Sequence, residues 1–176
     1  MCELHRHSSF HHSSFNRRQL GALFAGAGGL ALFPMRARAA DIEALAITCI
    51  DYRLVDDGVK FFNSIHLTKE YDQVALAGAS LAAVSPKFPS SNAAVWDHVV
   101  IAKQLHHIKK VIFLDHRDCG AYKVAFGKEF AAATDAETAQ HKSVMQQAKA
   151  MLAQKHPELG CEGYLMALNG TAEKLI

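Results

Sequence analysis

The sequence predicts an α/β domain of three layers, in which helices flank a mostly parallel sheet of about four strands. Short apolar runs alternate along the chain with segments whose apolar residues recur at helical spacing. Half of the residues are hydrophobic, and the chain contains no internal repeat and no low-complexity linker. Such alternation is typical of strand–helix–strand units, which build parallel sheets. In these sheets ligands bind beyond the carboxyl ends of the strands, so the site is expected there.

Four runs are predicted to form the strands. Three of them are apolar or alternating segments that end in a turn signal, at residues 44–49, 73–77 and 111–114. The fourth, residues 163–168, is closed by Asn169-Gly170. Runs of four to eight residues bounded by glycine or polar turns are the usual length of buried strands.

Three segments with helical periodicity lie between these strands. The first is residues 55–69, and the second opens at Ser90 or Ser91 after a proline-containing loop. The third opens with the capping box Thr134–Glu137 and ends before Pro157. Four histidines occur among polar residues of these helices, which is typical of surface positions: His66, His98, His141 and His156.

Residues 1–39 are predicted to be a twin-arginine-type signal peptide. Arg17-Arg18 precedes an apolar stretch at 21–33, and Ala37-Arg38-Ala39 supplies a small-x-small cleavage site. The apolar stretch is shorter than the ~20 residues that span a bilayer, which favours a signal peptide over an anchor. The alternative is a soluble N-terminal helix. We therefore expect export to the periplasm, with only transient membrane contact, and a single α/β domain at 40–176.

The net positive charge of the chain comes from the predicted signal peptide. Residues 40–176 keep 14 of the 19 basic residues and 16 of the 17 acidic ones, a formal charge of −2. Nothing in this balance points to nucleic acid or to an anionic membrane as a partner. We therefore expect a small-molecule substrate.

Two cysteines and a histidine follow predicted strands. Cys49 ends the first strand, and His116 and Cys119 come directly after the third. If these strands are neighbours, the three side chains converge, and thiolate and imidazole are ligands that zinc prefers. One zinc ion per chain is expected, with water in the fourth position. A Cys49–Cys119 disulfide and a redox dithiol are the alternatives, and Cys161 is interpreted as a structural or surface thiol.

The motif Cys49-x-Asp51-x-Arg53, followed by His116-x-x-Cys119-Gly120, resembles the signature of the β-class carbonic anhydrases. The resemblance covers most of residues 44–170. It implies zinc held by the two cysteines and the histidine, with Asp51 and Arg53 beside the metal. It also implies a homodimer or higher homo-oligomer. The chain departs from the family in having Tyr52 where Ser is common and in lacking long N-terminal helices, so it resembles a short, divergent, exported member.

The chemistry of these residues agrees with that resemblance. Zinc lowers the pKa of bound water to about 7. Asp51 can accept a hydrogen bond from the resulting hydroxide, while Arg53 holds the carboxylate in place and keeps it ionised. The expected function is the reversible hydration of carbon dioxide to bicarbonate by a zinc-bound hydroxide. In an alternative, closed state, Asp51 itself is the fourth zinc ligand.

Two other functions are compatible with the sequence. One is hydrolysis of carbonyl sulfide or carbon disulfide, and the other is a zinc-binding homologue without turnover. Asp115 and Asp118 flank the expected zinc ligands, and either can accept the second ring N–H of His116, unless Asp115 points away from it in the strand. Small residues at turns permit close approach, and four of them are expected to border the pocket: Gly78, Ala79, Ser80 and Gly120.

Overall fold

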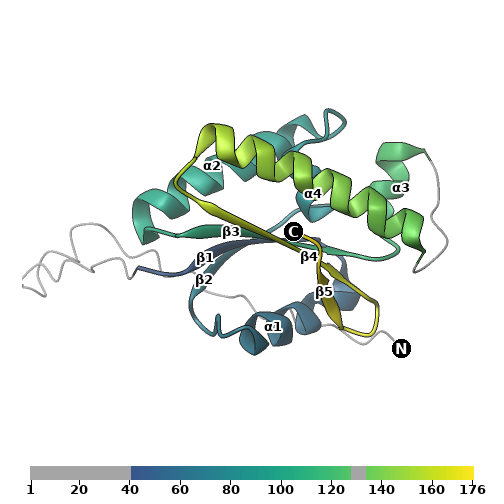
Figure 1. The fold of residues 1–176 in the computed structure, drawn as a ribbon, viewed down its shortest axis with the longest axis horizontal. Helices are drawn as coiled ribbons and strands as arrows, with labels where there is room; N and C mark the ends of the chain where they lie inside the picture. The colour runs from purple at the N-terminus through teal and green to yellow at the C-terminus, as the bar shows by residue number, and fades with distance from the viewer. Residues whose placement is uncertain (1–40, 128–133) are drawn as a thin grey trace, which may run out of the picture. The chain divides into compact units, whose positions relative to one another are not determined.

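A five-stranded sheet organises the fold in the computed structural model, which describes residues 41–127 and 134–176. The predicted signal peptide lies outside the described residues. The strands are β1 (Ala44–Thr48), β2 (Tyr71–Ala75), β3 (Lys110–His116), β4 (Gly160–Met166) and β5 (Ala172–Lys174). Their order is β2-β1-β3-β4-β5, with the first four parallel and β5 antiparallel to β4 (Figure 1). The four-stranded parallel core is confirmed, and β5 is an addition at its edge.

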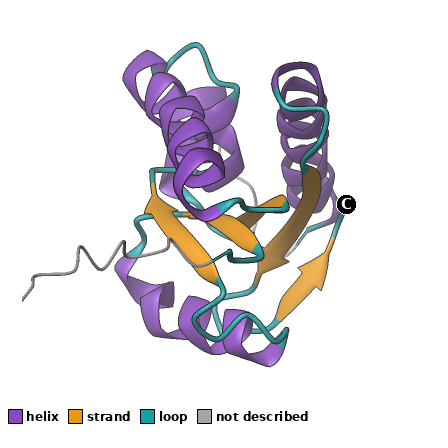
Figure 2. Cartoon of the chain, turned by 90° about the vertical axis from the view of Figure 1, so that its left-hand side faces the viewer, coloured by secondary structure: helices purple, strands orange, loops and turns teal. Residues whose placement is uncertain are grey.

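Helices cover both faces of the sheet. The helices α2 (Pro89–His106) and α4 (Asp135–Lys155) lie on one face, and α1 (Val55–Ser64) lies on the other (Figures 1 and 2). The side chains of β1 explain this arrangement because they alternate between two cores. Leu45 and Ile47 belong to the core beneath α2 and α4, whereas Ala44 and Ala46 pack in the core with α1. The predicted three-layer architecture is therefore confirmed.

The helix and strand boundaries differ from the predictions at several points. The helix α1 ends at Ser64, five residues before the predicted end. The helix α2 begins at Pro89 instead of after Ser90, because proline in the first turn has no N–H to leave unsatisfied. A short helix, α3 (Gly120–Phe126), was not predicted, because Gly120 alone indicated a turn. Two 3-10 turns, η1 (Tyr52–Leu54) and η2 (Ala79–Ala83), follow β1 and β2.

The site lies where β1 and β3 end side by side. Thr48, the last residue of β1, pairs with Leu114 of β3. The chain leaves β1 toward α1 on one face, and after β3 it continues to α3 and then α4 on the opposite face. Neighbouring strands whose connections leave toward opposite faces open a crevice at their carboxyl ends. Cys49 and His116 therefore lie at the position expected for a ligand.

The longest helix, α4, places two ionisable side chains in the interior. Glu137 and His141 are each 1% exposed. The prediction that His141 is a surface residue is wrong, and His156 is likewise buried. Among the described helices, none combines the length and apolar character needed to cross a bilayer.

Candidate metal centre

Three side chains converge at the ends of β1 and β3. A ligand atom of each of Cys49, His116 and Cys119 lies within 4.8 Å of the others. The two Sγ atoms are 3.9 Å apart, and both cysteines are free thiols in the structure. Two sulfurs at zinc–sulfur distances of 2.3 Å around a tetrahedral ion would be separated by about 3.8 Å. The spacing of the sulfurs therefore fits zinc.

The orientation of His116 supports the same assignment. Its Nδ1 lies 2.8 Å from the carbonyl oxygen of Arg117. A carbonyl only accepts, so the proton is on Nδ1 and Nε2 carries a free lone pair. The Nε2 atom is buried and has no hydrogen-bond partner among the described residues. Since buried polar atoms normally have partners, an unpaired Nε2 beside two sulfurs fits a metal ligand.

The Nδ1 atom of His116 is hydrogen-bonded to a backbone carbonyl and not to either flanking aspartate. Neither Asp115 nor Asp118 accepts its N–H, because the backbone carbonyl of Arg117 does so. The Asp115 side chain is buried among other donors, and the Asp118 carboxylate pairs with Arg53 and Lys123. The contact that orients the ligand is therefore a main-chain contact, and no side-chain pattern could reveal it.

The two thiols have opposite acidities. The hydrogen bond from the Cys119 thiol, together with His116 and the Gly78 N–H, outweighs burial and lowers the pKa of Cys49 to about 4. The same hydrogen bond to Cys49, reinforced by burial, raises the pKa of Cys119. For His116, burial opposes protonation, but the contacts with Cys49 outweigh it and raise the pKa. One thiolate is thus present at neutral pH, and a metal ion would displace the proton of the second thiol.

An acidic and a basic residue lie directly beside these three side chains. The Asp51 Oδ2 atom is 3.7 Å from Nε2 of His116. The Arg53 guanidinium donates to both carboxylate oxygens of Asp51 and also reaches Asp118 Oδ2 at 3.0 Å. Hydrogen bonding from Arg53 lowers the pKa of Asp51 to about 2. Asp51 is therefore an ionised hydrogen-bond acceptor that faces the centre.

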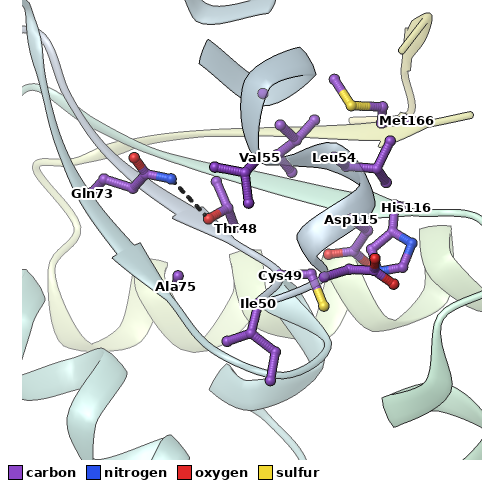
Figure 3. Close-up of a pocket in the computed structure, with 13 residues that line it drawn as sticks. Thr48, Cys49, Ile50, Leu54, Val55, Gln73, Ala75, Asp115, His116 and Met166 are labelled. Atoms are coloured by element: carbon purple, nitrogen blue, oxygen red, sulfur yellow. Dashed lines mark hydrogen bonds and ion pairs between the residues drawn. The ribbon is translucent and has the colours of Figure 1, made fainter. Parts of the chain in front are cut away.

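Two cavities meet at this centre. The first, of about 220 Å³, lies between β1 and α1 (Figure 3). Leu54, Val55 and Met166 lie on one side of it, and Cys49 and His116 lie on another (Figure 3). The second cavity, of about 450 Å³, opens on the α3 side. Both are mainly apolar, which suits a small uncharged ligand.

Most of the residues that line the first cavity were not predicted as site residues, and Gln73 and Met166 are two examples. Gln73 on β2 donates to Thr48 Oγ1 at 3.1 Å, and Met166 ends β4 (Figure 3). Both side chains belong to ordinary strand patterns in the sequence. Only the strand order brings them to the site, so the sequence carries no local signal for them.

Of the four predicted pocket residues, Gly120 alone lines a cavity, the second one. The other three, Gly78, Ala79 and Ser80, are absent from the linings of both cavities. Gly78 instead donates its N–H to Cys49 Sγ at 3.3 Å. Ser80 contacts Asp115 behind the site, through its N–H and its hydroxyl. Gly78 therefore contacts Cys49 directly, and Ser80 contacts the residue before His116.

A buried polar cluster surrounds Asp115, the residue before His116. Its carboxylate accepts from Ser80, from the Tyr122 hydroxyl at 2.6 Å and from His141 Nδ1 at 2.8 Å. Burial and the charge of Asp115 raise the pKa of Tyr122 well above its usual value, so its hydroxyl remains a donor. The cluster connects the end of β3 to η2, α3 and α4.

A comparison with protein families shows to which family the chain belongs. A family model described as "Putative carbonic anhydrase" matches residues 39–175. The chain belongs to this carbonic anhydrase-like family. It is 36% identical over 135 residues to an uncharacterized protein of Rickettsia conorii, covering 77% of this chain and 73% of that protein. A Rickettsia bellii protein is equally similar, with 77% and 82% covered.

Solved carbonic anhydrases share the fold of this family member. The Streptococcus mutans enzyme has a TM-score of 0.53 at 17% identity, covering 90% of this chain and 93% of that one. The enzyme of Glaciozyma antarctica has a TM-score of 0.52 at 18% identity, with 92% and 96% covered. Tetrameric β-carbonic anhydrases of Sordaria macrospora give 0.50 at 14% identity, with 82% and 85% covered. The resemblance read from the sequence to β-class carbonic anhydrases is confirmed at the level of family and fold.

Proposed function

We propose that the protein catalyses the reversible hydration of carbon dioxide to bicarbonate at a zinc ion held by Cys49, His116 and Cys119. The observation that carries this proposal is the unpartnered His116 Nε2 atom. It lies beside two free thiols, with the ionised Asp51 carboxylate 3.7 Å away. A set of two sulfurs, one nitrogen and a nearby acceptor suits a catalytic metal, which needs an open position.

Cys49, His116 and Cys119 would hold the zinc ion and leave its fourth position to water, whose pKa the ion would lower to about 7. Asp51 accepts a hydrogen bond from the attacking oxygen and fixes the direction of its lone pair. Arg53 holds Asp51 through two parallel hydrogen bonds and keeps it ionised. Asp118 anchors the other side of the guanidinium. The dyad thus orients the nucleophile.

Carbon dioxide is small, linear and without net charge, so an apolar cavity suits it better than a polar one. Leu54, Val55 and Met166 supply this surface in the first cavity. In the alternative closed state, Asp51 would itself occupy the fourth metal position.

The test is a stopped-flow hydration assay on the zinc-loaded protein, run beside a hydrolysis assay on carbonyl sulfide. We expect carbon dioxide hydration to dominate and to disappear after zinc removal. Faster turnover of carbonyl sulfide or carbon disulfide would replace the proposed substrate with a related one. Stoichiometric zinc without turnover of any of them would indicate a zinc-binding homologue without catalysis and contradict the proposal.

We further propose that the protein assembles as a homodimer or larger homo-oligomer. Three apolar side chains near the site are solvent-exposed in one chain: Ile50, Tyr52 and Val55. The tetrameric state of the Sordaria macrospora neighbours supports the proposal. Light scattering on the purified protein measures the mass, and a monomer at micromolar concentration would contradict it.

Export by the twin-arginine route to the periplasm is also a proposal. It rests on Arg17-Arg18, the apolar stretch at 21–33 and the Ala37-Arg38-Ala39 cleavage site. Fractionation of cells that express the full chain should recover a processed form beginning near Ala40 in the periplasm. Replacing both arginines with lysine should retain the precursor in the cytoplasm, and unchanged export of that variant would contradict the twin-arginine assignment.

A further inference from the structure

The segment Asp115–Cys119 carries two of the three proposed ligands and contains a residue with a positive φ. Asp118, between His116 and Cys119, adopts a left-handed conformation with φ of +57°. This conformation is uncommon for residues other than glycine, although aspartate adopts it more readily than most. It turns the chain so that the histidine and the following cysteine face the same centre. Contacts from outside the segment add to the stability of this turn.

One such contact comes from Glu137, in the first turn of α4. Its Oε1 atom accepts the backbone N–H of Asp118 at 2.6 Å. Its Oε2 atom accepts from the Arg117 guanidinium at 3.1 Å. A buried carboxylate is costly unless charged or strong donors satisfy it, and here both donors belong to the ligand segment. Glu137 thus binds the turn at its left-handed residue.

A second contact comes from His141, one turn further along the same face of α4. Its Nδ1 atom lies 2.8 Å from Asp115 Oδ2, on the other side of His116. Residues four apart on a helix project from one face, so Glu137 and His141 contact the two ends of a single segment. In Figure 1, the N-terminal end of α4 lies next to α3, which continues from this segment. Helix α4 therefore holds the segment on both sides of the histidine ligand.

We propose that Glu137 and His141 are positioning residues, which hold Asp115–Cys119 in the conformation that presents His116 and Cys119 to the metal. The proposal rests on the zinc site of the proposed function. Neither residue is assigned as a metal ligand, and they act through Asp118, Arg117 and Asp115. Asp118 also accepts a hydrogen bond from Arg53, which orients Asp51. By fixing Asp118, Glu137 therefore also helps to position Arg53.

The test uses two matched pairs of variants. Glu137→Met and His141→Leu replace each side chain by an apolar one of similar size and remove its hydrogen bonds. Glu137→Gln keeps an acceptor for the Asp118 N–H, and His141→Asn keeps a donor near the position of Nδ1. The control is Leu152→Ala, which removes a buried contact of the same helix in the core beneath α2 and α4.

Two measurements are made on each full-length variant. Zinc affinity is measured by competition with a chelator, and the cobalt-substituted protein gives absorption bands that report the geometry of the two thiolates and the imidazole. Loss of an outer contact to a metal ligand typically lowers affinity by about 10–100-fold. Because Glu137 and His141 reach the proposed ligands through neighbouring residues, this range is the upper limit of the effect. We expect a loss of affinity within this limit and altered cobalt bands in the two apolar variants, with most of the affinity retained in the conservative variants. Leu152→Ala should lose thermal stability but keep wild-type affinity and bands.

Each other outcome contradicts the proposal. Wild-type affinity and bands in a folded Glu137→Met or His141→Leu would show that the residue does not position the ligands. An equal loss of affinity in Leu152→Ala would show a general effect of stability. If one apolar variant fails to fold, the other decides, and if both fail while Leu152→Ala folds, the two residues have a structural role only. Absence of zinc binding by the wild-type protein would instead contradict the proposed function, and this inference with it.

Discussion

The Arg53 guanidinium donates two hydrogen bonds to the Asp51 carboxylate, from Nε to Oδ1 at 2.9 Å and from Nη2 to Oδ2 at 2.7 Å. This two-point contact fixes the plane of the carboxylate and leaves Oδ2 directed toward His116 Nε2. The relation between these two side chains decides whether Asp51 orients the nucleophile or closes the metal site.

Replacement of Asp51 by Asn tests the orienting role. Asn keeps the size of the side chain and cannot serve as an ionised acceptor paired with Arg53. We expect zinc content to remain at the wild-type level while the stopped-flow hydration rate falls by about 10–100-fold. Wild-type activity in this variant would show that Asp51 does not orient the attacking oxygen.

Removal of the metal should release two thiols. Cys49 and Cys119 are free in the structure, as is the half-buried Cys161. In the zinc-loaded native protein the two ligands should be protected from a thiol reagent, and addition of a chelator should expose two further reactive thiols per chain. An unchanged thiol count would point to a Cys49–Cys119 disulfide. A Cys161→Ser variant is the control and should show the same increase of two.

Glycine at position 78 is required by the backbone and by the site. Gly78 has a φ of +83°, and an added Cβ would lie 3.0 Å from Leu81 and 3.1 Å from Ala121. Gly78→Ala should lower the free energy of unfolding by about 1–2 kcal/mol or more, since the left-handed conformation alone costs that much. It should also weaken zinc binding, because the Gly78 N–H donates to Cys49 Sγ.

The matched control is Gly120→Ala at the start of α3, where an added Cβ meets nothing within 4 Å. Alanine favours a helix, so this change should leave stability equal or raise it by up to about 1 kcal/mol. Urea unfolding of the metal-free proteins measures both variants. A larger loss at position 120 than at position 78 would contradict the assignment of strain to Gly78.

Acid sensitivity should arise in part from Glu162 on β4. Burial opposes its ionisation, but hydrogen bonds from Lys110 and Tyr164 outweigh it and lower the pKa to about 2. The unfolded value is about 4.3, so the stabilisation is complete above that pH and is lost as the pH falls toward 2. Unfolding experiments on wild type and Glu162→Gln should therefore diverge near neutral pH and converge near pH 2.

The control for this effect is Glu158→Gln, because Glu158 forms an exposed pair with Lys103. Exposed pairs contribute little to stability, so this variant should follow the wild type at every pH. A Glu162→Gln variant that shows the same difference from wild type at pH 2 and pH 7 would rule out the titration of Glu162 as the cause.

The fold and the convergence of Cys49, His116 and Cys119 could be predicted because their signals are local. Apolar runs that end in Cys49 and His116 mark strand ends, and the spacing of His116 and Cys119 fits one centre. The strand β5 gave no such signal, since its three residues, Ala172–Lys174, are mostly polar and its pairing with β4 supplies the order.

The supporting residues could not be predicted, because their partners are distant along the chain. Glu137 stands in a capping box and His141 among polar residues, and both patterns indicate an exposed helix. Their burial follows from the packing of α4 against the segment 115–119. The hydrogen bonds of Glu137 and His141 with this segment join residues that are 19 to 26 positions apart in the sequence. The sequence identifies the ligand types, and the tertiary structure identifies what holds them.

X-ray absorption at the zinc edge, combined with metal analysis of the purified protein, tests the central claim most directly. We predict one zinc ion per chain, bound by two sulfurs at about 2.3 Å and by two nitrogen or oxygen atoms, one of them exchangeable with solvent. Absence of stoichiometric zinc, or a bond between the sulfurs of Cys49 and Cys119, would contradict it.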